Sequence, residues 1–103
     1  MGFEFRIKTG FFETKPFDLL IGKGKLILSP TEPEDQVIII KEEDILSITL
    51  KNVKSLEIEI QTWDKLYQGV LSRKVDYEKL LSELKENINK KIICEYGGEK
   101  DYA

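Results

Sequence analysis

The chemistry open to this chain is limited first by the residues it lacks. Among its 103 residues there is no histidine, the side chain that most often serves as general base and metal ligand. The single cysteine, Cys94, cannot form an internal disulfide, and no histidine is present to activate its thiol. We therefore expect Cys94 to be inert and the protein to reside in a reducing, cytoplasmic setting.

Carboxylates are concentrated in one short part of the chain. They are Glu32, Glu34, Asp35, Glu42, Glu43 and Asp44. A divalent cation could bind such residues, but the Asp-x-Asp-x-Asp-Gly spacing of a calcium loop is absent. Paired carboxylates can also hydrolyse glycosides, yet that needs a substrate cleft for which so short a chain has little surface. We expect solvated turns here, with contact to a basic partner as the alternative, and we predict no enzyme activity, catalytic residue, metal or cofactor.

Lys15, Lys23 and Lys25 are the candidate residues for binding an anion. Residues 1–25 hold five Lys/Arg and three Asp/Glu, a local net charge of +2. An anionic membrane surface attracts each nearby basic residue by about 1 kcal/mol, so three lysines would give only weak binding to lipid headgroups. We favour the interpretation that these are solvated lysines, which protect strand edges from aggregation. The Gly22–Lys25 run (GKGK) lacks the spacing of a phosphate-binding loop.

Trp63 is the only tryptophan, and it falls at an expected hairpin tip. Exposed, it would be a contact for a partner or a membrane; folded over the end of the sheet it would belong to the core, and we favour this packing. Phe11 and Phe12 pose a related choice, because adjacent strand residues face opposite sides. One of the two must face solvent, a second sheet or a neighbouring chain, which suggests self-association.

The composition is that of one soluble globular domain spanning residues 1–103. Hydrophobic residues make up 41% and charged residues 34%, and the net charge is −3. This charge balance argues against a nucleic-acid partner, because binders of polyanions are normally basic.

Hydrophobic periodicity predicts strands first and one helix last. An alternation of apolar and polar residues is clearest at residues 3–8 and 56–61. The run 36–41 is apolar enough to be a strand buried on both faces. From Val75 the period changes to that of an amphipathic helix over about 76–91, with Asp76 as its N-cap. Residues 91–96 either extend the helix or form a strand, and we expect the tail 97–103 to be flexible. The seven expected strands lie within 3–72, at residues 3–8, 17–21, 25–29, 36–41, 45–51, 56–61 and 66–71.

Three segments give the chain a likeness to a known superfamily. Gly24–Ser29 (GKLILS), Val37–Ile40 (VIII) and Glu43–Ile48 (EDILSI) resemble the opening of a GRAM or bacterial pleckstrin-homology-like (PH-like) domain. There, a glycine-led strand precedes a second strand and an acidic turn into the third. The later strands and the helix complete a similar order over about residues 18–91.

This resemblance implies an α+β fold in which about seven antiparallel strands form a bent two-sheet PH-like barrel, capped by the C-terminal amphipathic helix. It also implies a scaffold for binding proteins or peptides, and the bacterial members resemble interaction and assembly modules. Phosphoinositide-binding members carry a tight basic cluster between their first two strands, which is missing here. We therefore expect a non-catalytic binding or assembly module whose partner is another protein or a second copy of the chain. Weak binding of anionic lipid through Lys15, Lys23 and Lys25 is the alternative.

Overall fold

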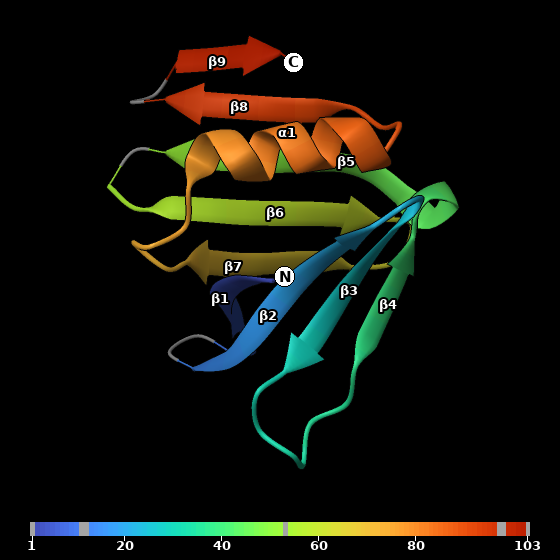
Figure 1. The fold of residues 1–103 in the computed structure, drawn as a ribbon, viewed down its shortest axis with the longest axis vertical. Helices are drawn as coiled ribbons and strands as arrows, with labels where there is room; N and C mark the ends of the chain where they lie inside the picture. The colour runs from blue at the N-terminus through green and yellow to red at the C-terminus, as the bar shows by residue number, and fades with distance from the viewer. Residues whose placement is uncertain (1, 11–12, 53, 97–98, 103) are drawn as a thin grey trace.

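The computed structural model describes residues 2–10, 13–52, 54–96 and 99–102. In these ranges nine strands form a single sheet in the order β4-β3-β2-β1-β7-β6-β5-β8-β9, with one α-helix and one short 3-10 helix, η1 (Figure 1). The bounds are β1 (Phe3–Lys8), β2 (Thr14–Gly22), β3 (Lys25–Pro30), β4 (Ile38–Lys41), η1 (Glu42–Asp44), β5 (Ile45–Asn52), β6 (Leu56–Thr62), β7 (Leu66–Leu71), α1 (Tyr77–Asn87), β8 (Ile92–Tyr96) and β9 (Glu99–Tyr102).

Two antiparallel meanders make up most of this sheet. Strands β1 to β4 pair in chain order, and so do β5 to β7. The two meanders are joined through β1, the first strand of one, and β7, the last strand of the other. These two strands pair antiparallel, with Phe5 opposite Leu71. The chain is thus an α+β protein that is mostly sheet, as its periodicity predicted.

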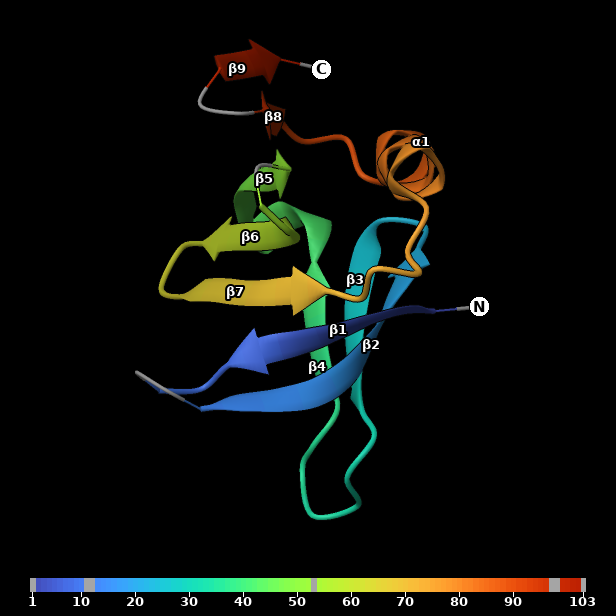
Figure 2. The same ribbon diagram turned by 90° about the vertical axis from the view of Figure 1, so that its left-hand side faces the viewer.

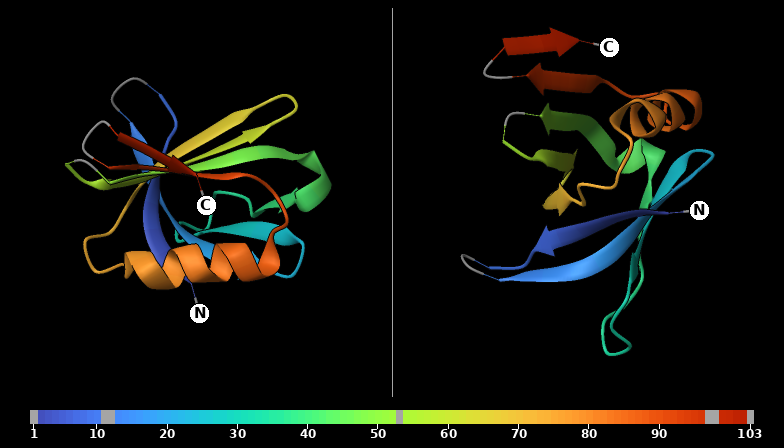
Figure 3. Two further views of the ribbon diagram at one scale, coloured as in Figure 1. Left: turned by 90° about the horizontal axis from the view of Figure 1, so that it is seen from above. Right: turned by 60° about the vertical axis from the view of Figure 1, so that its left-hand side comes forward.

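The sheet bends sharply, so that its two halves face each other. Strands β2 to β4 cross the direction of β5 to β7 at a steep angle, and α1 lies along the inner side of β5 and β8 (Figure 1). In the turned views α1 lies between β5 and β8 on one side and the ends of β2 and β3 on the other (Figures 2 and 3). The backbone N–H of Gly24, in the β2–β3 turn, donates to the carbonyl oxygen of Asn87 at the end of α1, 2.9 Å away.

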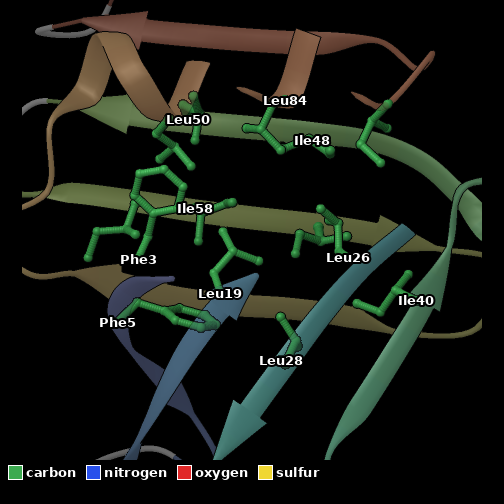
Figure 4. Close-up of a cluster of buried hydrophobic side chains, with 14 of the residues drawn as sticks. Phe3, Phe5, Leu19, Leu26, Leu28, Ile40, Ile48, Leu50, Ile58 and Leu84 are labelled. Atoms are coloured by element: carbon green, nitrogen blue, oxygen red, sulfur yellow. The ribbon is translucent and has the colours of Figure 1, made fainter. Parts of the chain in front are cut away.

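The core fills the space inside this bend. Along β1 the buried residues Phe3, Phe5 and Ile7 alternate with exposed polar ones, as a strand with one buried face requires. Leu19, Leu26, Leu28 and Ile40 face the core from one half, Ile48, Leu50 and Ile58 from the other, and Leu84 comes from the helix (Figure 4).

Helix α1 begins where the sequence predicted but ends four residues early. The Asp76 side chain accepts a hydrogen bond from the Lys79 backbone N–H at 3.2 Å, which confirms the N-cap. At Ile88 the backbone is already extended, and its side chain is buried in the core. The helix stops at Asn87 for two reasons. The Gly24 N–H binds the Asn87 carbonyl oxygen, and Ile88 continues the core packing in an extended conformation.

Residues 3–72 form seven strands that pair antiparallel with one another, but the sheet continues beyond the seven strands that the sequence predicted. Residues 92–96 form β8, which settles the open choice for this segment, and β8 pairs parallel with β5. Part of the tail expected to be flexible, 99–102, forms β9 against β8. The hydrogen-bonded strands form one open sheet with β4 and β9 at its two edges rather than a closed barrel.

Candidate functional site

Trp63 is the most exposed large hydrophobic residue among the described ones, with 73% of its surface open. The expected packing of Trp63 into the core was therefore wrong. Alternation along β6 directs Ile58, Ile60 and Thr62 inward, so Thr62 is the last residue of β6 to face the core. Its Oγ1 accepts from the Lys65 backbone N–H at 3.1 Å and donates to the Lys65 carbonyl oxygen at 3.0 Å. These bonds close the turn and leave Trp63 outside it.

The indole of Trp63 is held against the segment that follows β4. Its Nε1–H donates to the Glu43 carbonyl oxygen in η1, 3.4 Å away. The β6–β7 hairpin is thus attached, through an exposed side chain, to the connection between the two halves of the sheet.

A cavity of about 430 Å³ opens between β4 and this hairpin. Its apolar wall consists of Ile39 and Ile40 from β4, and its aromatic wall of Trp63 and Tyr67. Two carboxylates, Asp44 and Asp64, complete the lining together with Thr62. We call this cavity the notch. Both charged residues that line it are acidic, while the ammonium group of the neighbouring Lys65 lies 5.7 Å from the centre of the Tyr67 ring.

The apolar wall of the notch continues along the edge of the sheet. Ile39 is 60% exposed and Val37, just before β4, is 55% exposed. The expectation that 36–41 is buried on both faces was wrong, because β4 is an edge strand and only Ile40 in it is fully buried. On the outer face Ile39 lies opposite Ile27, which in turn lies opposite Leu20. An apolar row therefore leads across three strands to the exposed edge.

The three candidate lysines do not form one site. Lys15 lies near the start of β2, whereas Lys23 and Lys25 lie at the turn that follows its end. At 3.3 Å per residue, β2 separates them by roughly 20 Å. The Lys15 ammonium group is 2.7 Å from the Asp35 carboxylate, and this hydrogen bond, aided by the charge of Asp35, raises the pKa of Lys15.

The acidic residues of 31–44 also have separate places. Asp35 pairs with Lys15, and the Glu42 carboxylate accepts a hydrogen bond from the backbone N–H of Asn89. Asp44 lines the notch. Within the described ranges, no three Cys, Asp or Glu side chains are arranged to hold a metal ion.

Two expectations remain, one about Cys94 and one about Phe11 and Phe12. Cys94 is buried in the core at 3% exposure, where a structural thiol is expected. Phe11 and Phe12, the suggested self-association residues, lie outside the described residues.

Apart from Trp63 and Asp44, the residues that line the notch escaped the sequence reasoning: Ile39, Ile40, Thr62, Asp64 and Tyr67. Residues 38–40 are all isoleucine, so the sequence does not show which of them faces outward. The net charge of −5 in 31–44, read as a surface for a basic partner, was the one signal that pointed toward Asp44.

No protein-family model matches the sequence, and no curated protein matches it either. No helix in the described part of the chain has the length and apolar character needed to cross a bilayer.

Proposed function

We propose that this chain is a non-catalytic binding or assembly module of PH-like architecture that docks another protein at the notch. The strand order β4-β3-β2-β1-β7-β6-β5, followed by a helix over the open end, supports the likeness to that superfamily. Strands β8 and β9 are additions to the order that the resemblance implied. A cytoplasmic setting, expected from the single cysteine, stays a prediction.

The observation that carries this proposal is the exposed apolar surface around a cavity. Trp63 and Ile39 both line the notch, and both are more than half exposed. Tryptophan is the residue type most enriched at the energetic centres of protein interfaces, and exposed apolar patches beside concave surfaces commonly mark such sites. Neither side chain is needed to fill the core.

The alternative, weak binding of anionic lipid headgroups through Lys15, Lys23 and Lys25, has less support. A membrane attracts lysines that face it together, and these three are divided between the two ends of β2. Lys15 is moreover engaged with Asp35. The carboxylates beside Trp63 would oppose its insertion into an anionic surface.

Site-specific photo-crosslinking in the source cells tests the docking proposal. A benzophenone amino acid is placed at position 63 and, as the matched control, at the exposed position 78 on α1. We expect a discrete crosslinked protein from position 63 that is absent from position 78 and is displaced by excess unlabelled protein. Equal products from the two positions, or none from position 63, would refute docking at the notch.

A further inference from the structure

The outer edge of β4 offers backbone groups for another strand. In an antiparallel pair, residues that exchange hydrogen bonds with the partner strand alternate with residues that do not. The Glu42 N–H bonds to the Gly24 carbonyl oxygen in the β3–β4 register, so Ile40 and Ile38 bond toward β3. Ile39 and Lys41 consequently direct their N–H and C=O groups to the edge of the sheet, where the described residues place no further strand.

The protection of this edge consists of its short length, four residues, and one lysine. Proteins block an edge with charge, proline, a bulge or a covering segment. Here Lys41 is the only charge in the strand, and Val37 and Ile39 are exposed apolar residues of strong strand propensity. An extended segment that pairs with β4 would run beside the notch, because Ile39 belongs to both.

Charge decides between a second copy of this chain and a different partner. If two β4 strands paired antiparallel about Ile39, Asp35 of one copy would lie opposite Glu43 of the other, and a parallel in-register pair would stack like charges. The segment 31–44 carries a net charge of −5. Lys15 neutralises Asp35, but the other five carboxylates keep the segment acidic. Self-pairing therefore brings like charges together, whereas a basic segment would neutralise them.

The notch itself suits one cationic side chain. Asp44 and Asp64 supply negative charge, and Trp63 supplies an aromatic face, while Lys65 already lies over the ring of Tyr67. A guanidinium or ammonium group gains both from the carboxylates and from the ring face, and its methylene stem packs on apolar surface such as Ile39.

We infer that the occupant of this site is an extended, basic segment of a partner protein, which pairs with the edge of β4 and inserts an arginine or lysine side chain into the notch. This inference rests on the proposed function and specifies its partner. The backbone pairing supplies affinity, and the cationic side chain supplies selectivity.

The chain carries its own reporter for the test, since its only tryptophan lies in the notch. The probe is a synthetic peptide of about ten residues, roughly the length that spans one strand and its flanks. Threonine and valine alternate in it around a central arginine, and its matched control has glutamate at the centre. We expect the arginine peptide to change the Trp63 fluorescence with saturation, and the glutamate peptide to bind at least about tenfold more weakly. Added salt should weaken the arginine peptide's binding.

Two sets of variants separate the side-chain and backbone parts of the inference. The double variant Asp44→Asn/Asp64→Asn should weaken the arginine peptide about tenfold, because it removes both carboxylates from the notch. Glu32→Gln/Glu34→Gln removes the same charge from the β3–β4 loop and should have a much smaller effect. Ile39→Pro removes an N–H that faces the edge and should abolish binding, while Ile39→Val should retain it. Thermal unfolding of each variant verifies that it is folded.

The outcomes distinguish this inference from the proposal on which it rests. If the arginine and glutamate peptides bind equally, or if neither binds, the inference is refuted. A specific crosslink from position 63 in the same circumstances would leave the docking function in place with a partner of other chemistry. Light scattering of the protein alone gives the remaining outcome: a dimer that Ile39→Pro dissociates would replace the basic partner with a second copy.

Discussion

The Nε1–H of Trp63 bonds to the backbone carbonyl oxygen of Glu43, 20 residues earlier in the chain. The most exposed aromatic side chain described thus has a hydrogen-bond partner that favours one orientation of the indole. A side chain that is already oriented loses less conformational freedom when a partner binds. The hydrogen bond therefore favours recognition at the notch without adding to the core.

Replacing Trp63 should leave the stability almost unchanged. Because 73% of its surface is exposed, we expect Trp63→Ala to change the free energy of unfolding by less than about 1 kcal/mol. Ile60→Ala, three residues earlier in β6 and 1% exposed, should cost about 2–5 kcal/mol. Urea unfolding followed by circular dichroism measures both. A large loss in the Trp63 variant would show that the indole supports the hairpin.

Gly69→Ala should destabilise the contact between the two halves of the sheet. A Cβ at this position would lie 2.5 Å from Cδ2 of Phe5, which packs directly over the glycine. Overpacking of this kind typically costs about 1–3 kcal/mol. Gly10→Ala is the control, because its Cβ would meet only Glu13, at 3.9 Å. Thermal melts that give equal transition temperatures for the two variants would contradict this packing.

Helix α1 should depend more on its buried face than on its cap. Leu84 is completely buried, so Leu84→Ala should cost about 2–5 kcal/mol. Asp76→Ala removes the acceptor for the Lys79 N–H and should cost about 1 kcal/mol. The partly buried Leu81 provides the matched control on the same helix. Equal losses for Leu81→Ala and Leu84→Ala, in denaturant titrations, would mean that the two faces are equally packed.

Glu59 should make the protein less stable in acid. Burial raises the pKa of its carboxyl group, but hydrogen bonds from Lys51 and Gln68 outweigh that effect and leave the pKa below its ordinary value of 4.5. The folded state therefore keeps the carboxylate charged at a pH where the unfolded chain binds a proton. This contribution to stability is present above pH 4.5 and is lost as the pH falls further.

Glu59→Gln tests this pH dependence. The free energy of unfolding of the variant should be about 0.5–1 kcal/mol lower at neutral pH. Below pH 4.5 it should decrease less steeply with falling pH than that of the original protein. Urea titrations at several pH values measure the difference. Parallel pH profiles of the two proteins would show that the ion pair contributes nothing.

The parts of the fold that local periodicity controls were predictable from the sequence. Residues 3–8 and 56–61 alternate cleanly, and both form strands with the expected faces buried. Asp76 has the residue type and position of an N-cap, and it caps α1. In each case the sequence pattern that predicts the element lies within a few residues of the chain.

The errors arose where distant residues decide the outcome. The end of α1 depends on Gly24, which binds the Asn87 carbonyl oxygen from another part of the fold. Strand β8 depends on β5, its parallel neighbour. The exposure of Ile39 follows from the strand order, because nothing in the run VIIIK shows that β4 lies at an edge. The notch could not be predicted because it combines that edge with a hairpin turn.

The pairing of β1 with β7 has a consequence for how the chain reaches its fold. Arg6 lies opposite Val70 in this pair. The contact that joins the two meanders therefore closes a loop that runs from residue 6 to residue 70. Each meander can form from local pairings, but their union must wait until β7 has left the ribosome. Folds dominated by such distant pairings fold slowly. During synthesis, the β1–β4 half will expose Phe5 and Leu19 to the cell before β5–β7 and α1 can cover them.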